Sequence, residues 1–177
     1  MGYFKKLIKP YIWKRIFYER LSEPVHLNLL SLFVMIFGSF RLKVAFDLVL
    51  RSQHAYALLK AADDAKKIGK ERVSVIEFGV ANGAGLFNIQ SIAKRVTKTT
   101  GIFFDIYGFD TGEGMPPPTS YKDHPDLYAE GDFPMDFEKL QNALDPNTKL
   151  VIGPIKETMS KFLEQDFKSS PIGFILI

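Results

Sequence analysis

The stretch VSVIEFGVANGAGL, residues Val73–Leu86, decides the fold. Its first six residues are rich in β-branched and aromatic side chains, which predicts a buried strand over 73–78. Glu77 lies at the carboxyl end of this strand, where open α/β sheets form their ligand crevices. Three glycines follow, Gly79, Gly83 and Gly85, and they permit a tight turn and a close approach of the backbone to a ligand. A helix predicted over 86–96 points its first amides at the same crevice. The stretch therefore predicts a nucleotide-type site with an acid at its floor.

A second acidic residue follows at the end of the next predicted strand. Residues 102–109 (IFFDIYGF) are apolar and lead into Asp110, which lies 25 residues after Gly85. A carboxylate at this point can accept hydrogen bonds from two ribose hydroxyls, so it favours an adenosine-containing ligand. We expect Asp105 to lie in the early loop region of this segment or to face outward, and we give it little functional weight.

The spacing of the glycines distinguishes between ligand classes. A dinucleotide site requires G-x-G-x-x-G. A frame that starts at Gly83 reaches Asn88 where the third glycine should be, and a frame that starts at Gly79 meets alanine at both later positions. Neither frame fits, and the pattern E-x-G-x-x-x-G instead resembles motif I of class I S-adenosylmethionine-dependent methyltransferases. Ala81 replaces the middle glycine of that motif.

The residues after the second strand narrow the resemblance. The run FDTGEGMPPP, residues 109–118, is similar to the macrocin O-methyltransferase-like branch of this superfamily, and the similarity covers roughly 56–177. It implies methyl transfer from S-adenosylmethionine to a small-molecule acceptor, often a hydroxyl of a sugar or natural product. It also implies a divalent metal such as Mg²⁺, with ligands beyond Ile177 and none assigned within this chain. The cofactor residues that the resemblance implies are Glu77, Gly79, Ala81, Gly83, Asp110, Thr111 and Glu113.

Strands and helices alternate along the rest of the chain. Further strands are predicted over 149–152 and 172–177, and helices over 54–68, 135–144 and 157–167. This alternation predicts an α/β fold, a Rossmann-like parallel sheet with flanking helices. The complete fold has seven strands, ordered 3-2-1-4-5-7-6, and about four are expected here. We therefore expect residues 52–177 to be the N-terminal part of a methyltransferase domain that lacks its C-terminal catalytic part.

Residues 1–51 differ in character and are expected to form a helical extension. They carry nine Lys/Arg against three Asp/Glu, a net charge of +6, whereas residues 52–177 have a net charge of −3. The extension is expected to pack on the domain or on a second subunit in a homo-oligomer, with peripheral membrane contact through residues 1–40 as the alternative. The uncharged run 25–40 has 16 residues, short of the roughly 20 that span a bilayer. Nucleic-acid binding is not expected, because bulky aliphatic residues dilute the basic ones.

Other candidate residues are few. His124 lies in the proline-rich loop 116–134, which we interpret as a possible cover for the acceptor site, and it is the one weak candidate for a catalytic base. His54 and Tyr56 are expected to pack or to face solvent. The chain has no cysteine, which fits a cytoplasmic protein. An NAD-dependent oxidoreductase and a non-catalytic membrane-associated protein stay open as alternatives.

Overall fold

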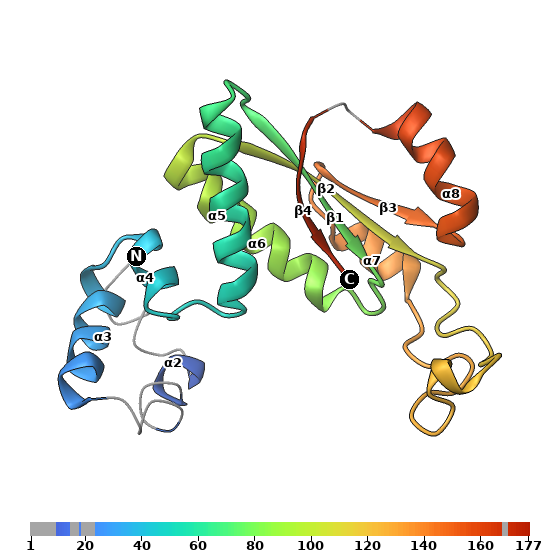
Figure 1. Cartoon of the computed structure of the whole chain (residues 1–177), viewed down its shortest axis with the longest axis horizontal. Coiled ribbons are helices and arrows are strands. Elements are labelled where there is room, and N and C mark those ends of the chain that lie inside the picture. The colour runs from blue at the N-terminus through green and yellow to red at the C-terminus, as the bar shows by residue number, and fades with distance from the viewer. Residues whose placement is uncertain (1–9, 15–17, 19–23, 168–169) are drawn as a thin grey trace.

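The computed structural model describes residues 10–14, 18, 24–167 and 170–177. Its centre is an all-parallel sheet of four strands in the order β3-β2-β1-β4 (Figure 1). The strands are β1 (Arg72–Phe78), β2 (Phe103–Asp110), β3 (Thr148–Ile152) and β4 (Ile172–Leu176). The predicted parallel α/β sheet is confirmed, and its strand order matches the first four positions of the Rossmann-like order.

Helices cover both faces of this sheet. One face carries α5 (Ser52–Lys67) and α6 (Ala84–Thr100), with α7 (Phe137–Ala143) beside the start of α6. The other face carries α8 (Ile155–Lys161), followed by a π-helical turn over Phe162–Asp166. Helix α6 is longer than predicted, because Gly83 and Gly101 adopt left-handed conformations at its two ends and set its limits there.

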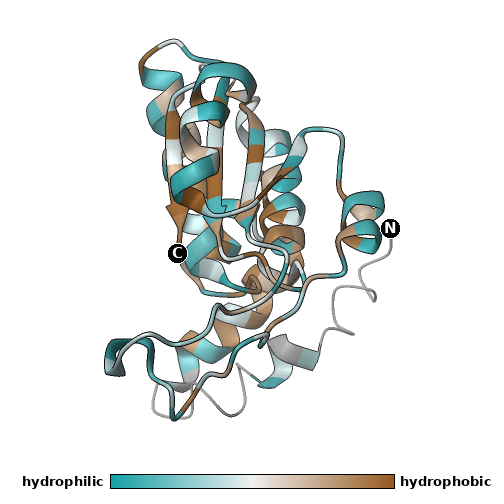
Figure 2. Ribbon diagram, turned by 90° about the vertical axis from the view of Figure 1, so that its right-hand side faces the viewer, coloured by the Kyte–Doolittle hydropathy of each residue, from teal (hydrophilic) through white to brown (hydrophobic). Residues whose placement is uncertain are grey.

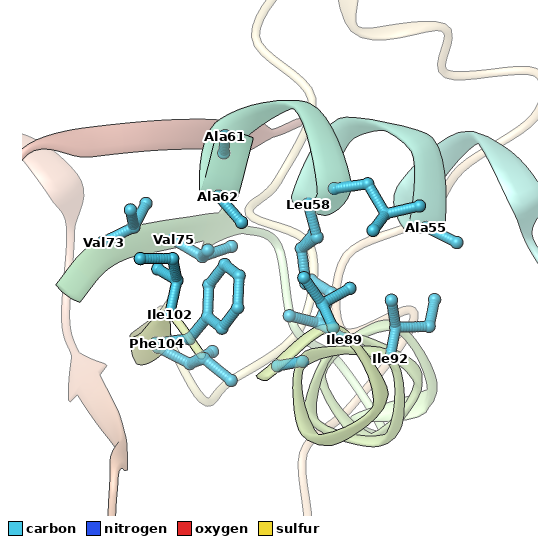
Figure 3. Close-up of a cluster of buried hydrophobic side chains, with 14 of the residues drawn as sticks. Ala55, Leu58, Ala61, Ala62, Val73, Val75, Ile89, Ile92, Ile102 and Phe104 are labelled. Atoms are coloured by element: carbon cyan, nitrogen blue, oxygen red, sulfur yellow. The ribbon is translucent and has the colours of Figure 1, made fainter. Parts of the chain in front are cut away.

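Apolar side chains fill the space on both sides of the sheet. Between the sheet and α5 and α6, the largest cluster includes Leu58, Val75, Ile89 and Phe104 (Figure 3). On the opposite face, the rings of Tyr107 and Phe109 contact the ring of Phe162 at centroid distances of 4.8 and 5.0 Å. The hydropathy colouring shows strands that are mostly hydrophobic between more hydrophilic helices (Figure 2). This burial on both faces is expected for a parallel sheet.

Our expectation for Asp105 is wrong. Its side chain lies on β2 with the residue 1 % exposed, on the face that α8 covers. The carboxylate accepts a hydrogen bond of 2.9 Å from Arg72 and lies 3.4 Å from the hydroxyl of Ser170. Because these partners come from the starts of neighbouring strands, the ion pair supports the amino-terminal edge of the sheet, opposite the predicted ligand crevice.

The described part of the N-terminal extension is helical. It comprises α2 (Pro10–Lys14), α3 (Val25–Phe37) and α4 (Phe40–Ala45). Helix α4 docks on the domain, where Arg41 forms a bidentate ion pair with Asp63 on α5 and the guanidinium of Arg95 lies 4.2 Å from the ring centroid of Phe40. Of residues 1–40, for which peripheral membrane contact is the alternative prediction, 1–9, 15–17 and 19–23 lie outside the described residues. Within those residues, no helix is both long and apolar enough to cross a membrane.

Candidate functional site

A pocket of about 340 Å³ lies at the carboxyl edge of the sheet, between the loops that follow β1, β2 and β3. Most of its lining is apolar, and the polar contributions include Asp110, Thr111 and Asp132. The lining residues are Gly79, Ala81, Phe109, Asp110, Thr111, Gly114, Met115, Pro116, Asp132, Phe133, Gly153 and Ile155. Four predicted cofactor residues, Gly79, Ala81, Asp110 and Thr111, are thereby brought together. The sequence did not predict the lining residues that follow β3, Gly153 and Ile155, or those at the end of the proline-rich loop, Asp132 and Phe133. Gly153 does directly follow a predicted strand, so it was expected at the same edge of the sheet.

Asp110 ties the first two loops together. Its Oδ2 accepts hydrogen bonds of 2.8 Å from the backbone amides of Val80 and Ala81, and its Oδ1 accepts one of 2.8 Å from the amide of Gly112. A carboxylate oxygen has two lone pairs, so Oδ1 keeps one further acceptor position. The residue therefore has a structural role that the sequence did not reveal, and its contact with a cofactor stays a prediction.

The loop after β1 depends on residues with positive φ. Gly79 has φ of 82°, and Ala81 has φ of 48°. An alanine rarely adopts this left-handed conformation, which costs about 1–2 kcal/mol relative to glycine. Because the amide of Ala81 is held by Asp110, the loop keeps the shape that a glycine would adopt freely. Alanine at this position therefore leaves the left-handed turn of this loop in place.

Glu77 is buried beside the first turn of α6. The residue is 4 % exposed, and its Oε2 has no hydrogen-bond partner among the described residues. Burial raises the pKa of Glu77 to about 7, against a smaller opposing effect of the positive charge of Arg51. A side chain at Gly85 would overlap with Oε1 of Glu77, which explains the glycine at that position. Glu77 does not line the pocket of 340 Å³ but lies on the α6 side of the same crevice.

Three further polar residues gather around Glu77 at the start of α5 and α6. His54 is 5 % exposed, and burial lowers its pKa, with a further lowering by the charge of Arg51 and an opposing effect of the nearby Asn88. Its Nδ1 and the Oδ1 of Asn88 have no partner among the described residues. We refer to Arg51, His54, Glu77 and Asn88 as the polar cluster, in which His54 and Glu77 are buried and the other two are half-buried. The sequence suggested that His54 packs in the domain, but it gave no signal for Arg51 or Asn88.

Gly83 does not reach the pocket. It is the N-cap of α6 with φ of 82°, and a Cβ there would overlap with the side chain of Leu140 on α7. The glycine is therefore required by the contact between α7 and α6. Gly83 therefore packs beside the crevice and does not line it.

The loop after β2 is closed at its base. The amide of Met115 donates to the carbonyl of Asp132 at 2.8 Å, and the amide of Gly131 donates to the carbonyl of Met115 at 2.9 Å. The base of the loop lines the pocket, whereas its tip carries a short 3-10 turn over Tyr121–Asp123 and is exposed. His124 ends that turn with φ of 50° and does not line the pocket.

Thr111 and Glu113, both predicted as cofactor residues, lie at the start of this loop. The hydroxyl of Thr111 donates to the carbonyl of Gly114 at 3.1 Å, so Thr111 shapes the turn that lines the pocket. Glu113 is exposed and outside the pocket lining. In the part of the chain that the structure describes, no group of three or more His, Asp or Glu side chains is placed to hold a metal ion.

Comparison with known proteins gives no match, either to a protein-family model, to a curated protein or to a solved structure. The class of the protein therefore follows from its own geometry. The fold is a Rossmann-like parallel sheet with a pocket at the carboxyl ends of three adjacent strands. An apolar pocket with a carboxylate at its wall suits a flat, largely apolar ring joined to a hydroxylated group.

Proposed function

We propose that this chain binds S-adenosylmethionine and belongs to a methyltransferase that acts on a hydroxyl of a small-molecule acceptor. The observation that carries the proposal is the pocket to which Gly79 and Ala81 of the E-x-G-x-x-x-G stretch and the FDTGEGMPPP stretch both contribute, with Glu77 and Gly83 next to it and outside its lining. The two stretches are joined directly by Asp110, which accepts from the amides of Val80 and Ala81, 30 and 29 positions earlier in the sequence.

The chemistry of the pocket fits the adenosine part of this cofactor. Phe109, Met115 and Ile155 offer apolar surface to an adenine ring, and the open lone pair of Asp110 Oδ1 offers an acceptor to a ribose hydroxyl. Gly79 and Gly153 lack side chains where the backbone lines the pocket. These features alone would serve NAD equally well.

The charge of Glu77 favours S-adenosylmethionine over a dinucleotide. A pyrophosphate that bound at the start of α6 would place two negative charges beside a buried carboxylate with an unpartnered oxygen. S-adenosylmethionine instead carries a positive sulfonium and a positive ammonium group. A nearby cation lowers the pKa of an acid, so such a ligand would draw Glu77 into its ionised form. The polar cluster thus offers the oxygens of Glu77 and Asn88 to a cationic ligand, while the positive charge of Arg51 offsets part of the repulsion that Glu77 would exert on an anionic one.

When bound, the cofactor supplies a methyl group, whose transfer to an acceptor oxygen breaks the carbon–sulfur bond while the hydroxyl proton passes to a base. The described residues contribute binding and orientation, which are a large part of catalysis for such transfers. Asp110 fixes the loop after β1, and Glu77 provides negative charge. We assign no residue as the base, since His124 lies at the exposed tip of its loop.

Calorimetric titration of the full chain with S-adenosylmethionine, S-adenosylhomocysteine and NAD tests this proposal. We expect the first two to bind and NAD not to bind. Asp110→Ala should weaken binding at least tenfold, and the matched control Asp126→Ala, an exposed acid on the same loop, should leave it unchanged. Binding of NAD alone would favour the oxidoreductase, and a folded chain that binds none of the three would refute the assignment.

A further inference from the structure

Helix α3 exposes a continuous apolar stripe. Four large side chains at helical spacing point away from the protein, and they are 63 %, 44 %, 60 % and 63 % exposed. These are Leu29, Leu30, Phe33 and Phe37, which we call the α3 stripe. The rings of Phe33 and Phe37 contact each other with centroids 5.0 Å apart, so two of its members form one surface.

The opposite side of α3 is packed, which fixes the orientation of the stripe. Ser31, Val34 and Met35 are buried, and Val34 and Met35 cluster with Leu48 beyond α4. Helix α4 is in turn held to the domain by the ion pair between Arg41 and Asp63. In Figure 1, α3 lies at one end of the molecule with α4 and α5 between it and the sheet. A ligand of the stripe would therefore approach from the side away from the sheet.

The size of the stripe limits what can cover it. The four side chains expose on the order of 500 Å² together, near the upper end of apolar patches on ordinary monomers, where such patches are often functional. A stable dimer buries about 800 Å² on each partner. The stripe alone therefore falls short of a dimer interface.

The charge of the segment around the α3 stripe favours a lipid bilayer over a second copy of the chain as its binding partner. Helix α3 has no Asp, Glu, Lys or Arg, whereas residues 1–51 as a whole carry a net charge of +6 and the rest of the chain −3. An apolar surface within a basic segment matches an anionic bilayer, in which acyl chains accept apolar side chains and headgroups attract Lys and Arg. Helix α3 has 13 residues, about 20 Å of helix, so it can lie in the interface but not cross a core of about 30 Å.

We propose that the α3 stripe docks this protein peripherally on an anionic lipid bilayer. Attachment at this end of the molecule leaves the pocket at the carboxyl edge of the sheet accessible. The proposal does not depend on the cofactor, because none of the pocket residues belongs to α3. It would hold equally for a protein without methyltransferase activity.

Co-sedimentation of the full chain with lipid vesicles tests this docking. Vesicles of phosphatidylcholine and phosphatidylserine in a 7:3 ratio should bind the protein, and pure phosphatidylcholine should bind it at least tenfold more weakly. Raising the salt from 0.1 to 0.5 M should weaken binding to the anionic vesicles, because the charges are then screened. The double variant Leu29→Ser/Phe33→Ser should lose at least tenfold in partitioning. The control Leu127→Ser, which removes a similarly exposed leucine from the loop after β2, should have no effect.

A second measurement separates the bilayer from a second copy of the chain. Phe33→Trp in a Trp13→Phe background places the sole tryptophan on the stripe, and brominated acyl chains should quench its fluorescence. Sedimentation velocity of the wild type and of Phe33→Ser reports self-association through the same surface. Three outcomes would overturn the proposal: absence of vesicle binding by the folded chain, equal binding to neutral and anionic vesicles, or a dimer that Phe33→Ser dissociates.

Discussion

Asp110→Ala should destabilise the fold strongly, because one carboxylate holds two loops. It accepts three backbone hydrogen bonds of 2.8 Å, from Val80, Ala81 and Gly112. A hydrogen bond to a charged group contributes about 1.5–3 kcal/mol, and the sum is an upper limit because bonds that share one acceptor group are not additive. Since these loops are partly exposed, water can replace some of the bonds. We therefore expect a loss of roughly 3–4 kcal/mol in the free energy of unfolding.

Urea denaturation followed by circular dichroism measures this loss. Asp126→Ala serves as the matched control, because Asp126 is an exposed acid of the neighbouring loop and its removal should change stability by no more than about 0.5 kcal/mol. Asp110→Asn should lie between wild type and Asp110→Ala, since its amide oxygen can still accept from two of the three donors. A loss below about 1 kcal/mol for Asp110→Ala would refute the reasoning that this carboxylate organises the loops.

Two further predictions concern the first turn of α6. Gly85→Ala should cost about 2–3 kcal/mol of unfolding free energy, because its Cβ would overlap with Glu77 Oε1, whereas Gly101→Ala, with open space around its Cβ but φ of 81°, should cost about 1–2 kcal/mol from backbone strain alone. A double-mutant cycle with Glu77→Ala should show a cost well below additive, and additivity would contradict the steric cause. Glu77→Gln should remove a pH dependence: the raised pKa of about 7 means that wild-type stability is full below about pH 4.5 and falls by roughly 3 kcal/mol as the pH rises through 7. Denaturation at pH 5 and pH 8 measures how the unfolding free energy changes with pH. An equal change for the wild type and for Glu77→Gln would contradict the role of Glu77.

The fold was predictable from local patterns. Residues 73–78 and 102–109 form short apolar runs that end in acids, and a helix of the right period separates them, so pairing into a parallel sheet was the expected result. The exact ends were less predictable where a single backbone conformation decides them. Helix α6 starts two residues early and ends four residues late because of the left-handed glycines at both ends. The division into an extension and a domain at residue 52 stays a prediction.

Asp105 shows why burial of a polar residue is hard to predict from sequence. An acid in the middle of an apolar strand is expected to face solvent unless a partner is available. Its partners, Arg72 and Ser170, come from positions 33 residues before and 65 residues after it. Only the register of β1 against β2 and the approach to β4 bring them together, and neither is encoded near Asp105.

The sequence predicted which residues lie at the candidate site better than it predicted what each of them does there. The sequence indicated that Gly79 and Asp110 lie at one edge, and the structure places both in the pocket lining. It could not indicate that Asp110 accepts from loop amides or that Gly83 serves the packing of Leu140, since both roles depend on loop conformation. Arg51 and Asn88 were missed because they act on Glu77 and His54 only across the interface between two helices and a strand.

The cost of burying Glu77 links stability to the proposed ligand. At neutral pH the folded chain holds a carboxyl group with an unpartnered oxygen next to a helix start, where a smaller polar residue would be less costly. A group whose pKa is raised to about 7 by burial can change charge in response to a ligand at physiological pH. A cationic ligand would bind more tightly as the pH rises through 7, because proton release accompanies its binding, whereas an anionic pyrophosphate would bind more weakly. Under the proposed function, the same residue that lowers the stability of the fold would, together with Arg51 beside it, influence the sign of charge that the crevice accepts.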